Sequence, residues 1–307
     1  MPDDLMKAVG RKALHISGAL EDSLLRAVGR ARLGMYLASD RRPWRVGYAE
    51  FKAQYLGRVL HDSGLMQVFR EGGELPLGHG YRLDARVVEI PWVLSKLCIG
   101  RTLLLDAGSS LNYEHVLRAP ALTEKYLTIL TLAPEPRCYW ERGVSYVFGD
   151  LRETLFRDDY FDEVACISTI EHVGMDNSRY TGGADGAKRT DADQFVGAAK
   201  EMRRILKPGG SLFITFPFGR YEDHEWFQQF DAERLDHLID AFGPGSLTEA
   251  IFQYQPDGWQ LSSREACAGC EFFDVHTSKY FDRSSSVEYP ADFAAGERAV
   301  ACLELCK

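Results

Sequence analysis

The stretch Leu103-Leu104-Leu105-Asp106-Ala107-Gly108-Ser109-Ser110-Leu111-Asn112 decides how this chain folds. Three consecutive leucines, then an acid and a run of small and polar residues, predict a short buried strand that ends in a tight turn. Such a turn lets the backbone approach a ligand closely, and a helix that begins after it offers N–H groups to an anion. Doubly wound folds in general contain such a turn, so the motifs that follow it in the sequence must show whether it binds a ligand.

From about residue 84 onward, short apolar runs alternate with helical patterns. The helix at Asp191–Leu206 is the clearest, with Asp191 as its N-cap and Pro208-Gly209-Gly210 as its stop, and a second helix runs from Asp231 to Phe242. The alternation predicts a doubly wound α/β fold with a mostly parallel, seven-stranded sheet. The predicted strands are Thr102–Asp106, Leu127–Leu132, Val144–Phe148, Glu163–Ser168, Ser211–Phe216, and the closing strands 246–254 and 298–305.

Two regions lie outside this pattern. Residues 1–83 are expected to form an N-terminal helical cap or arm, with one or two helices over 5–38, before a main domain at 84–307. Residues 262–296 are expected to be an insertion or long loop.

Charge and composition narrow the function classes. Thirty-six Lys and Arg against forty-five Asp and Glu give a net charge of −9, which disfavours nucleic acid as a partner. Residues 1–45 carry nine basic and five acidic side chains, so this arm either packs as an ordinary cap or contacts a membrane surface or a partner. The apolar runs are too short to span a bilayer and the seven cysteines are scattered, so we expect a cytoplasmic protein with reduced thiols.

Four motifs, in order over residues 102–218, resemble those of class I S-adenosylmethionine-dependent methyltransferases. Asp106 and Gly108 fit the first motif, while Ser110 and Asn112 stand where the second and third glycines usually lie. The other motifs are Phe148-Gly149-Asp150, the run 160–173 that ends in Glu171-His172, and the run 202–215 that contains Lys207-Pro208-Gly209-Gly210. The resemblance covers about Val88 to Phe242 and implies a Rossmann-like fold with S-adenosylmethionine as the cofactor.

The resemblance also implies which residues bind the cofactor. Asp150 is expected to hold the adenine amino group, and Glu135 is the nearest replacement for the ribose-binding acid that usually ends the second strand. The full expected set is Asp106, Gly108, Ser109, Ser110, Asn112, Leu132, Glu135, Asp150, Leu151, Ser168 and Glu171.

Two histidines are candidates for a catalytic base, because histidine suits that role near neutral pH. His224, in the segment 220–226 after the fifth strand, is the first choice, and His172, after the fourth strand, is the second. Tyr180, Arg220, Tyr221 and Trp226 are expected to bind the acceptor. The loop 174–190, which contains Tyr180, Gly182, Gly183, Asp185 and Gly186, is either a lid or an ordinary surface loop.

Two further groups of side chains, a cysteine pair and a set of aspartates, contain residue types that bind metals, but a metal site is not the favoured interpretation of either group. Cys267 and Cys270 have the spacing of half a zinc site, and a closed site needs four ligands. Asp176, Asp185, Asp191 and Asp193 carry the hard oxygen ligands that magnesium prefers, although acids in a polar loop usually face water. We therefore predict no metal.

The sequence favours methylation of a hydroxyl group on a small molecule or on a sugar of a surface glycan. The glycan is suggested by a wider resemblance, at 88–93, 215–219 and 230–231, to methyltransferase-like proteins found with surface-polysaccharide biosynthesis. An inactive cofactor-binding partner subunit is the alternative, and an NAD(P)-dependent oxidoreductase or epimerase is disfavoured because the first turn lacks G-x-G-x-x-G. The sequence does not fix the oligomeric state.

Overall fold

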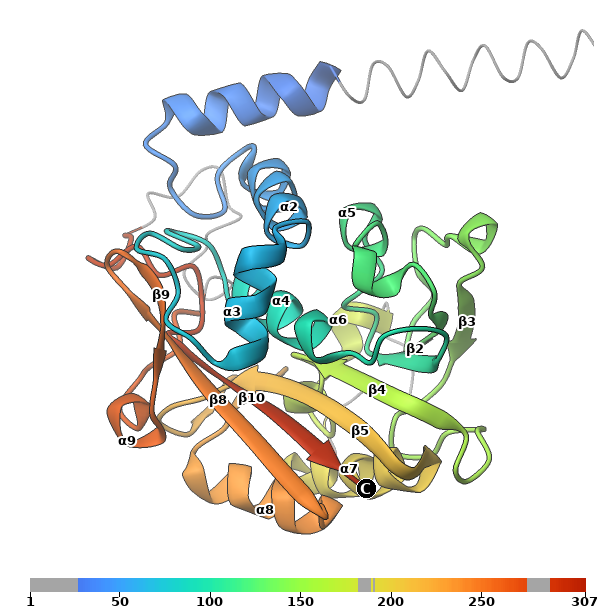
Figure 1. Cartoon of the computed structure of the whole chain (residues 1–307). Helices are drawn as coiled ribbons and strands as arrows, with labels where there is room; N and C mark the ends of the chain where they lie inside the picture. Colours follow the sequence, from blue (N-terminus) through green and yellow to red (C-terminus); the bar gives the residue numbers. More distant parts are fainter. Residues whose placement is uncertain (1–26, 182–188, 190, 275–287) are drawn as a thin grey trace, which may run out of the picture. The chain divides into compact units, whose positions relative to one another are not determined.

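The computed structural model describes residues 27–181, 189, 191–274 and 288–307 (Figure 1). The chain forms two compact units, Met1–Gln54 and Tyr55–Lys307. In the first unit, residues 27–38 are helical, which agrees with the helical pattern predicted there, while the rest of the 5–38 prediction lies outside the described residues. Helix α2 (Tyr48–Val59) begins in the first unit and ends in the second. No helix in the described ranges is long and apolar enough to cross a membrane.

A single sheet runs through the second unit in the order β3-β2-β1-β4-β5-β10-β8-β9. Neighbours from β3 to β5 pair in parallel, whereas β10 is antiparallel to both β5 and β8. This confirms the doubly wound, mostly parallel Rossmann-like fold. The strands are β1 (Leu103–Ala107), β2 (Tyr126–Thr131), β3 (Ser145–Phe148), β4 (Phe161–Ile167), β5 (Leu206–Pro217), β8 (Ser246–Gln255), β9 (Gly258–Ser262) and β10 (Ala299–Cys306).

The described part of the sheet has eight strands rather than the predicted seven, because β9 extends it. Strand β9 pairs with β8 across a tight turn at residues 256–257, with Gln255 opposite Gly258. Gly258 has a φ of +123°, and a Cβ there would lie 2.4 Å from the His79 carbonyl oxygen, so this turn requires glycine. The Pro-Asp-Gly run at 256–258 was the available sequence signal for this hairpin.

Helices cover both faces of the sheet (Figure 1). One face carries α7 (Phe195–Ile205) and α8 (Ala232–Phe242), and the other carries α3 (Ser63–Glu71) and α4 (Arg86–Lys96). Asp231 caps α8 as predicted, because its side chain accepts the Arg234 N–H. Short elements complete the fold: α5 (Glu114–Leu117), α6 (Ser178–Thr181), α9 (Arg264–Cys267), the small hairpin β6 (Glu222–Asp223) and β7 (Gln228–Gln229), and the 3-10 turns η1 (Pro120–Leu122), η2 (Trp140–Arg142), η3 (Ile170–His172) and η4 (Ala192–Gln194).

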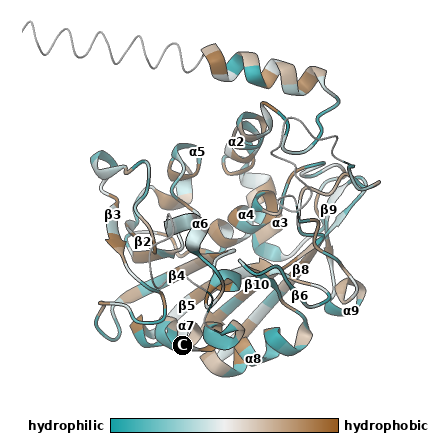
Figure 2. Cartoon of the chain, turned by 180° about the vertical axis from the view of Figure 1, so that it is seen from behind, coloured by the Kyte–Doolittle hydropathy of each residue, from teal (hydrophilic) through white to brown (hydrophobic). Residues whose placement is uncertain are grey.

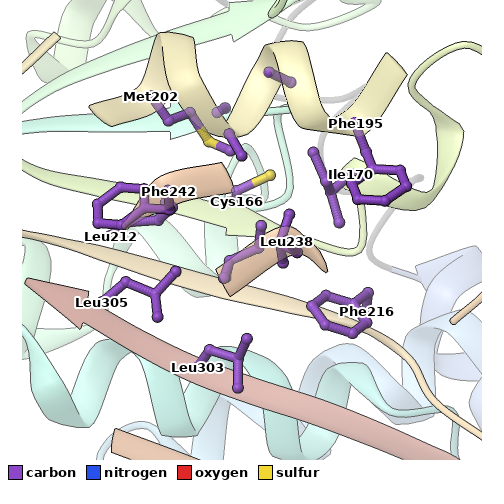
Figure 3. Close-up of a cluster of buried hydrophobic side chains, with 14 of the residues drawn as sticks. Cys166, Ile170, Phe195, Met202, Leu212, Phe216, Leu238, Phe242, Leu303 and Leu305 are labelled. Atoms are coloured by element: carbon purple, nitrogen blue, oxygen red, sulfur yellow. The ribbon is translucent and has the colours of Figure 1, made fainter. Parts of the chain in front are cut away.

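The main core lies between the sheet and helices α7 and α8 (Figure 3). The apolar stripe predicted for α7 is buried at Phe195, Ala198, Ala199, Met202 and Ile205. In Figure 2 the central strands are mainly brown, whereas α8 also carries teal, polar residues. The periodic residues of α7 therefore all face this core, as expected of an amphipathic helix packed on a sheet.

A buried ion pair fastens β4 to the segment that leads into β2. Lys125 Nζ lies 2.5 Å from the Glu163 carboxylate, and both side chains are 1% exposed. Glu163 also accepts the Cys98 N–H, and Lys125 also donates to the Cys98 carbonyl. Each buried charge is therefore balanced by its partner and stabilised by a further hydrogen bond to the main chain at Cys98.

We expect Lys125→Met to lower the free energy of unfolding by about 3–5 kcal/mol, since it leaves the Glu163 carboxylate buried and unpaired. Urea unfolding at neutral pH measures the loss. The matched control is Arg118→Met, which removes an exposed partner of Glu114 and should cost at most about 1 kcal/mol. Equal losses in the two variants would contradict the role given to the buried pair.

Candidate cofactor and acceptor site

The site lies at the carboxyl ends of the parallel strands, where the strand order reverses. Strand β1 has β2 on one side and β4 on the other, so the connections that leave β1 and β4 run in opposite directions along the sheet. Ligands of doubly wound folds bind in the crevice at such a point. The loops after β1, β2, β3 and β4 carry most of the predicted cofactor residues.

The side chain of Asp106 holds the turn after β1 in place through two hydrogen bonds. Its buried carboxylate accepts the N–H groups of Ser110, at 3.2 Å, and Leu111, at 2.8 Å. Burial raises the pKa of Asp106 to about 7, although these two N–H groups act to lower it. Asp106 thus shapes the turn and lines neither of the two cavities described below.

Gly108 is the point of closest approach between the β1 and β4 loops. Its φ is +121°, and a Cβ there would lie 1.9 Å from Thr169 Oγ1. The Gly108 N–H donates to the Leu130 carbonyl of β2 at 2.8 Å. No other residue type fits this backbone conformation and this space together.

Ser110 and Asn112, which replace the usual glycines, brace the turn against its neighbours. Ser110 Oγ donates to the Ile167 carbonyl at the end of β4, at 2.6 Å. Asn112 Nδ2 donates to Glu135 and to the Arg137 carbonyl, and Asn112 Oδ1 accepts from the Tyr146 hydroxyl. The turn is therefore fixed by side-chain hydrogen bonds to β4 and to the segment after β2.

Two adjoining cavities open at this edge. The narrow cavity, of about 100 Å³, reaches the ends of β2 and β3, and the wide cavity, of about 680 Å³, extends over the β1 turn. They share the lining residues Gly108, Thr131, Leu132, Thr169, His172 and Asn177, so they form one continuous site.

Asp150, the predicted adenine-binding residue, lies at the narrow cavity together with Leu151 from the predicted cofactor set. Asp150 is paired with Arg152 at 2.6 Å. Burial acts to raise the pKa of Asp150, but the hydrogen bonds from Arg152 outweigh it and lower that pKa. The Asp150 carboxylate is consequently ionised at neutral pH and is an acceptor for an amino group.

The wide cavity contains Ser109, Ser110, Asn112, Leu132, Glu135 and Ser168 from the predicted set. Glu135 is held at its wall by Asn112, which places a carboxylate where a diol can be bound. Ser109 Oγ is buried and has no hydrogen-bond partner in the described part of the chain. A polar ligand in this cavity would satisfy that atom, and this observation fits a bound nucleoside-type cofactor.

A buried carboxylate, Glu89 of α4, connects the floor of the wide cavity to the sheet. Glu89 accepts from Ser168 Oγ at 2.6 Å and from Thr215 Oγ1 at 2.7 Å, and it pairs with Arg86 Nη1 at 2.5 Å. Ser168 therefore orients Glu89. Arg86, which lines the wide cavity, was not predicted from the sequence, because its position at the site follows from how α4 packs on β4 and β5.

His172 lines both cavities, and its neighbours fix its orientation. Its Nδ1 lies 2.9 Å from the Trp226 carbonyl oxygen, so in the neutral ring Nδ1 carries the proton and Nε2 is the basic nitrogen. The Trp226 ring packs on the imidazole at a centroid distance of 5.1 Å, and Tyr180, which lines the wide cavity, lies at 5.6 Å.

His224 is placed differently from His172. It lines neither cavity, and its ring stacks on Phe227 between two carboxylates, Glu222 at 3.0 Å and Asp274 at 3.4 Å. Burial acts to lower the pKa of His224, but the hydrogen bond and charge of Asp274, with those of Glu222, outweigh it and raise the pKa. This environment suits an imidazolium cation more than a base.

The remaining predicted acceptor residues lie around that loop. Arg220 pairs with Glu271 at 2.9 Å, Tyr221 packs under the Arg234 guanidinium, and Trp226 supports His172. None of the three lines either cavity. Glu171, from the predicted cofactor set, is buried and lines neither cavity. Its Oε2 has no hydrogen-bond partner among the described residues, and burial raises its pKa well above the usual range.

The structure bears in part on the metal and lid hypotheses. Within the described ranges, no group of three or more His, Cys, Asp and Glu side chains is arranged to hold a metal ion. Asp191 caps η4 and Asp176 accepts the Ser178 N–H. Gly182, Gly183, Asp185 and Gly186, from the magnesium and lid hypotheses, lie outside the described residues.

Fold and site together define a doubly wound α/β protein with a crevice at the strand-order reversal. Two acids, Asp150 and Glu135, and three arginines, Arg86, Arg137 and Arg152, line this crevice. Residues 125–214 match the family model described as a methyltransferase domain. This match supports an S-adenosylmethionine-dependent methyltransferase domain and indicates S-adenosylmethionine as its cofactor.

Comparison with known proteins adds the following similarities. The chain is 20% identical to the cyclase SpnF (83% of this chain, 94% of the other, TM-score 0.45). It is 12% identical to an S-adenosylmethionine-dependent methyltransferase from Archaeoglobus fulgidus (74% and 96%, 0.45). It is 14% identical to a Burkholderia thailandensis N1-methyltransferase solved with S-adenosylhomocysteine (85% and 89%, 0.40). No curated protein sequence matches the chain.

Gly108→Ala should lower the affinity for S-adenosylhomocysteine at least about tenfold, because the new Cβ meets Thr169 and the positive φ strains the turn. Isothermal titration measures the change. The control is Gly197→Ala, where a Cβ in α7 meets nothing within 4 Å and the affinity should be unchanged. Undiminished affinity in Gly108→Ala would separate the β1 turn from ligand binding.

Proposed function

We propose that the protein is an O-methyltransferase that acts on a hydroxyl group of a small molecule, including a sugar unit of a glycan. The observation that carries the proposal is the continuous site in which the β1 turn, Glu135, Asp150 and His172 line two joined cavities. The methyltransferase-domain match over 125–214 supports it independently.

In this proposal, the predicted residues divide the cofactor between the two cavities. Asp150 and Leu151 hold the adenine in the narrow cavity, and Glu135 takes the ribose hydroxyls. The β1 turn and Arg86 face the amino-acid end, where the Arg86 guanidinium offers a planar donor fork to a carboxylate. S-adenosylmethionine, when bound, supplies a methyl group that its sulfonium has already activated.

His172 acts as the base, because Nε2 is its proton-accepting nitrogen and the ring borders both cavities. The Trp226 carbonyl keeps the proton on Nδ1 and holds the ring in position while Nε2 takes the hydroxyl proton. The main-chain hydrogen bond thus sets the tautomer, the ring contacts hold the imidazole in its orientation, and the cavity wall would position the acceptor for transfer.

The wall beyond the cofactor residues suits a polyhydroxylated acceptor. Tyr113 and Tyr180 are about half exposed and provide flat ring surfaces. Asn177 donates its amide nitrogen to the His172 and Met175 carbonyls and offers its side-chain carbonyl oxygen as an acceptor. Aromatic faces with a few polar groups orient sugar-like ligands while leaving room for different ring substituents.

We expect Asp150→Asn and Arg86→Lys to separate the two ends of the cofactor. Asp150→Asn should weaken both S-adenosylhomocysteine and methylthioadenosine about tenfold, since both carry adenine. Arg86→Lys should weaken only S-adenosylhomocysteine by a similar factor, because methylthioadenosine lacks the carboxylate that the arginine fork would bind. Isothermal titration gives both affinities. Equal weakening of the two ligands by Arg86→Lys would contradict its placement at the amino-acid end.

His172→Asn should slow methyl transfer by about 10²–10⁴-fold and leave the affinity for S-adenosylhomocysteine nearly unchanged. Asparagine keeps an N–H for the Trp226 carbonyl and lacks a basic nitrogen. Release of S-adenosylhomocysteine with small phenols, nucleotide sugars and glycan fragments measures turnover. His224→Asn is the matched variant, and a larger loss there would assign the base to His224 instead.

The same measurements address the two other functions that the sequence leaves open. Tight binding of S-adenosylhomocysteine with no turnover on any acceptor would favour the inactive partner subunit. Binding of NAD(P) in place of S-adenosylhomocysteine would favour the oxidoreductase.

A further inference from the structure

We propose that Cys267 and Cys270 form a redox-active dithiol that closes reversibly to a disulfide by exchange with a low-molecular-weight disulfide such as glutathione disulfide. The proposal is independent of the proposed methyl transfer, because thiol exchange needs neither cofactor nor acceptor.

The backbone brings the two cysteines within the reach of a disulfide. Cys267 is the last residue of α9, and the Cys270 N–H donates to the Cys267 carbonyl at 2.9 Å, which closes a four-residue turn. Turns of this kind hold the first and fourth Cα atoms less than about 7 Å apart, and disulfides span about 4.4–6.8 Å. The two thiols also lie close enough for each to shift the pKa of the other.

The surroundings of the pair distinguish an attacking thiol from a resolving one. Cys270 is partly exposed, and Gln253 Nε2 lies 3.7 Å from its sulfur. Cys267 is fully buried, and its thiol donates to Ser262 Oγ at 3.4 Å. The interaction with the Cys267 thiol lowers the pKa of Cys270 to about 7 against the opposing effect of burial, and Gln253 and the Arg298 charge act in the same direction. The same interaction raises the pKa of Cys267.

The exchange proceeds in two balanced steps. The Cys270 thiolate attacks one sulfur of glutathione disulfide and releases one glutathione thiolate, which leaves a mixed disulfide on Cys270. The Cys267 thiol then loses its proton to solvent and attacks the Cys270 sulfur, which releases the second glutathione. The protein loses two electrons and two protons, and one glutathione disulfide becomes two glutathione thiols.

The dithiol is attached to the loop that carries Trp226. The Cys270 carbonyl accepts the Arg220 N–H and the Gln229 side-chain amide, both at 2.9 Å. Gly219 packs so closely on Cys270 that a Cβ there would lie 2.3 Å from this carbonyl oxygen. Both ends of the 219–229 loop are therefore hydrogen-bonded to Cys270, and a disulfide at Cys270 would restrain the residue that holds them.

The test is to treat the full-length chain with excess glutathione disulfide near neutral pH, quench with acid, alkylate the remaining thiols and map them by peptide mass. We expect a linked Cys267–Cys270 peptide that has lost two hydrogens and carries no glutathione. In Cys267→Ser the mixed disulfide should accumulate on Cys270, since no resolving thiol is present. Cys98→Ser, which changes an exposed cysteine elsewhere, should give the wild-type result.

A second measurement uses the unmodified protein and so does not depend on whether the variants fold. The pH dependence of alkylation should show Cys270 reacting at least about tenfold faster than Cys98 at pH 7, because burial raises the pKa of Cys98. Glutathione on Cys98 or Cys138 with Cys267 and Cys270 still reduced would overturn the proposal. So would equal alkylation rates of Cys270 and Cys98.

Discussion

The site depends on one buried carboxylate, Asp106, at the end of β1. It accepts two consecutive backbone N–H groups from Ser110 and Leu111, so the chain must turn sharply directly above it. That turn forces Gly108 into a left-handed conformation against Thr169, and this contact joins the β1 and β4 loops. Both cavities form where these two loops meet, because Gly108 and Thr169 line each of them. The Asp106 hydrogen bonds therefore hold in place the turn whose Gly108 lines both cavities.

The unusual polar residues of this turn have a structural explanation. A glycine-rich turn approaches its ligand closely but is flexible, because glycine loses the most conformational freedom on folding. Ser110 and Asn112 instead contribute side-chain hydrogen bonds to β4 and to the segment after β2. These two side chains therefore make the turn more rigid than glycines at the same positions would. Asn112 also fixes Glu135 at the cavity wall, which links the departure in the first motif to the departure at the end of the second strand.

The sequence was sufficient for features that depend on local pattern. The apolar spacing of α7 and the Asp231 cap are each determined by residues close together in the chain, and the structure has both. The bounds around α7 differ from the prediction: Asp191 caps the short turn η4 that precedes α7, and β5 begins at Leu206 rather than at Ser211, so the Pro208-Gly209-Gly210 run lies inside the strand. Strand β9 was missed because a five-residue strand after a short turn produces little periodic signal. The roles of Arg86 and His172 depend on contacts between distant residues. The partner of His172 is the Trp226 carbonyl, a backbone atom 54 positions away, and no pattern of side chains reports it.

The charge arrangement beneath the site follows from burial. Glu171 and Glu297 interact with the guanidinium of Arg86, as do Glu89 and Asp84. Burial raises the pKa of Glu171 well above its usual range and that of Glu297 to about 7. Protons on these acids leave Arg86 with the Glu89 carboxylate, whose other oxygen is held by Ser168 and Thr215. As pH rises and Glu297 ionises, the negative charge near Arg86 increases and its attraction for an anion decreases. In the proposed cofactor site, binding of a carboxylate at Arg86 would therefore be coupled to protonation of acids that do not themselves line the cavity.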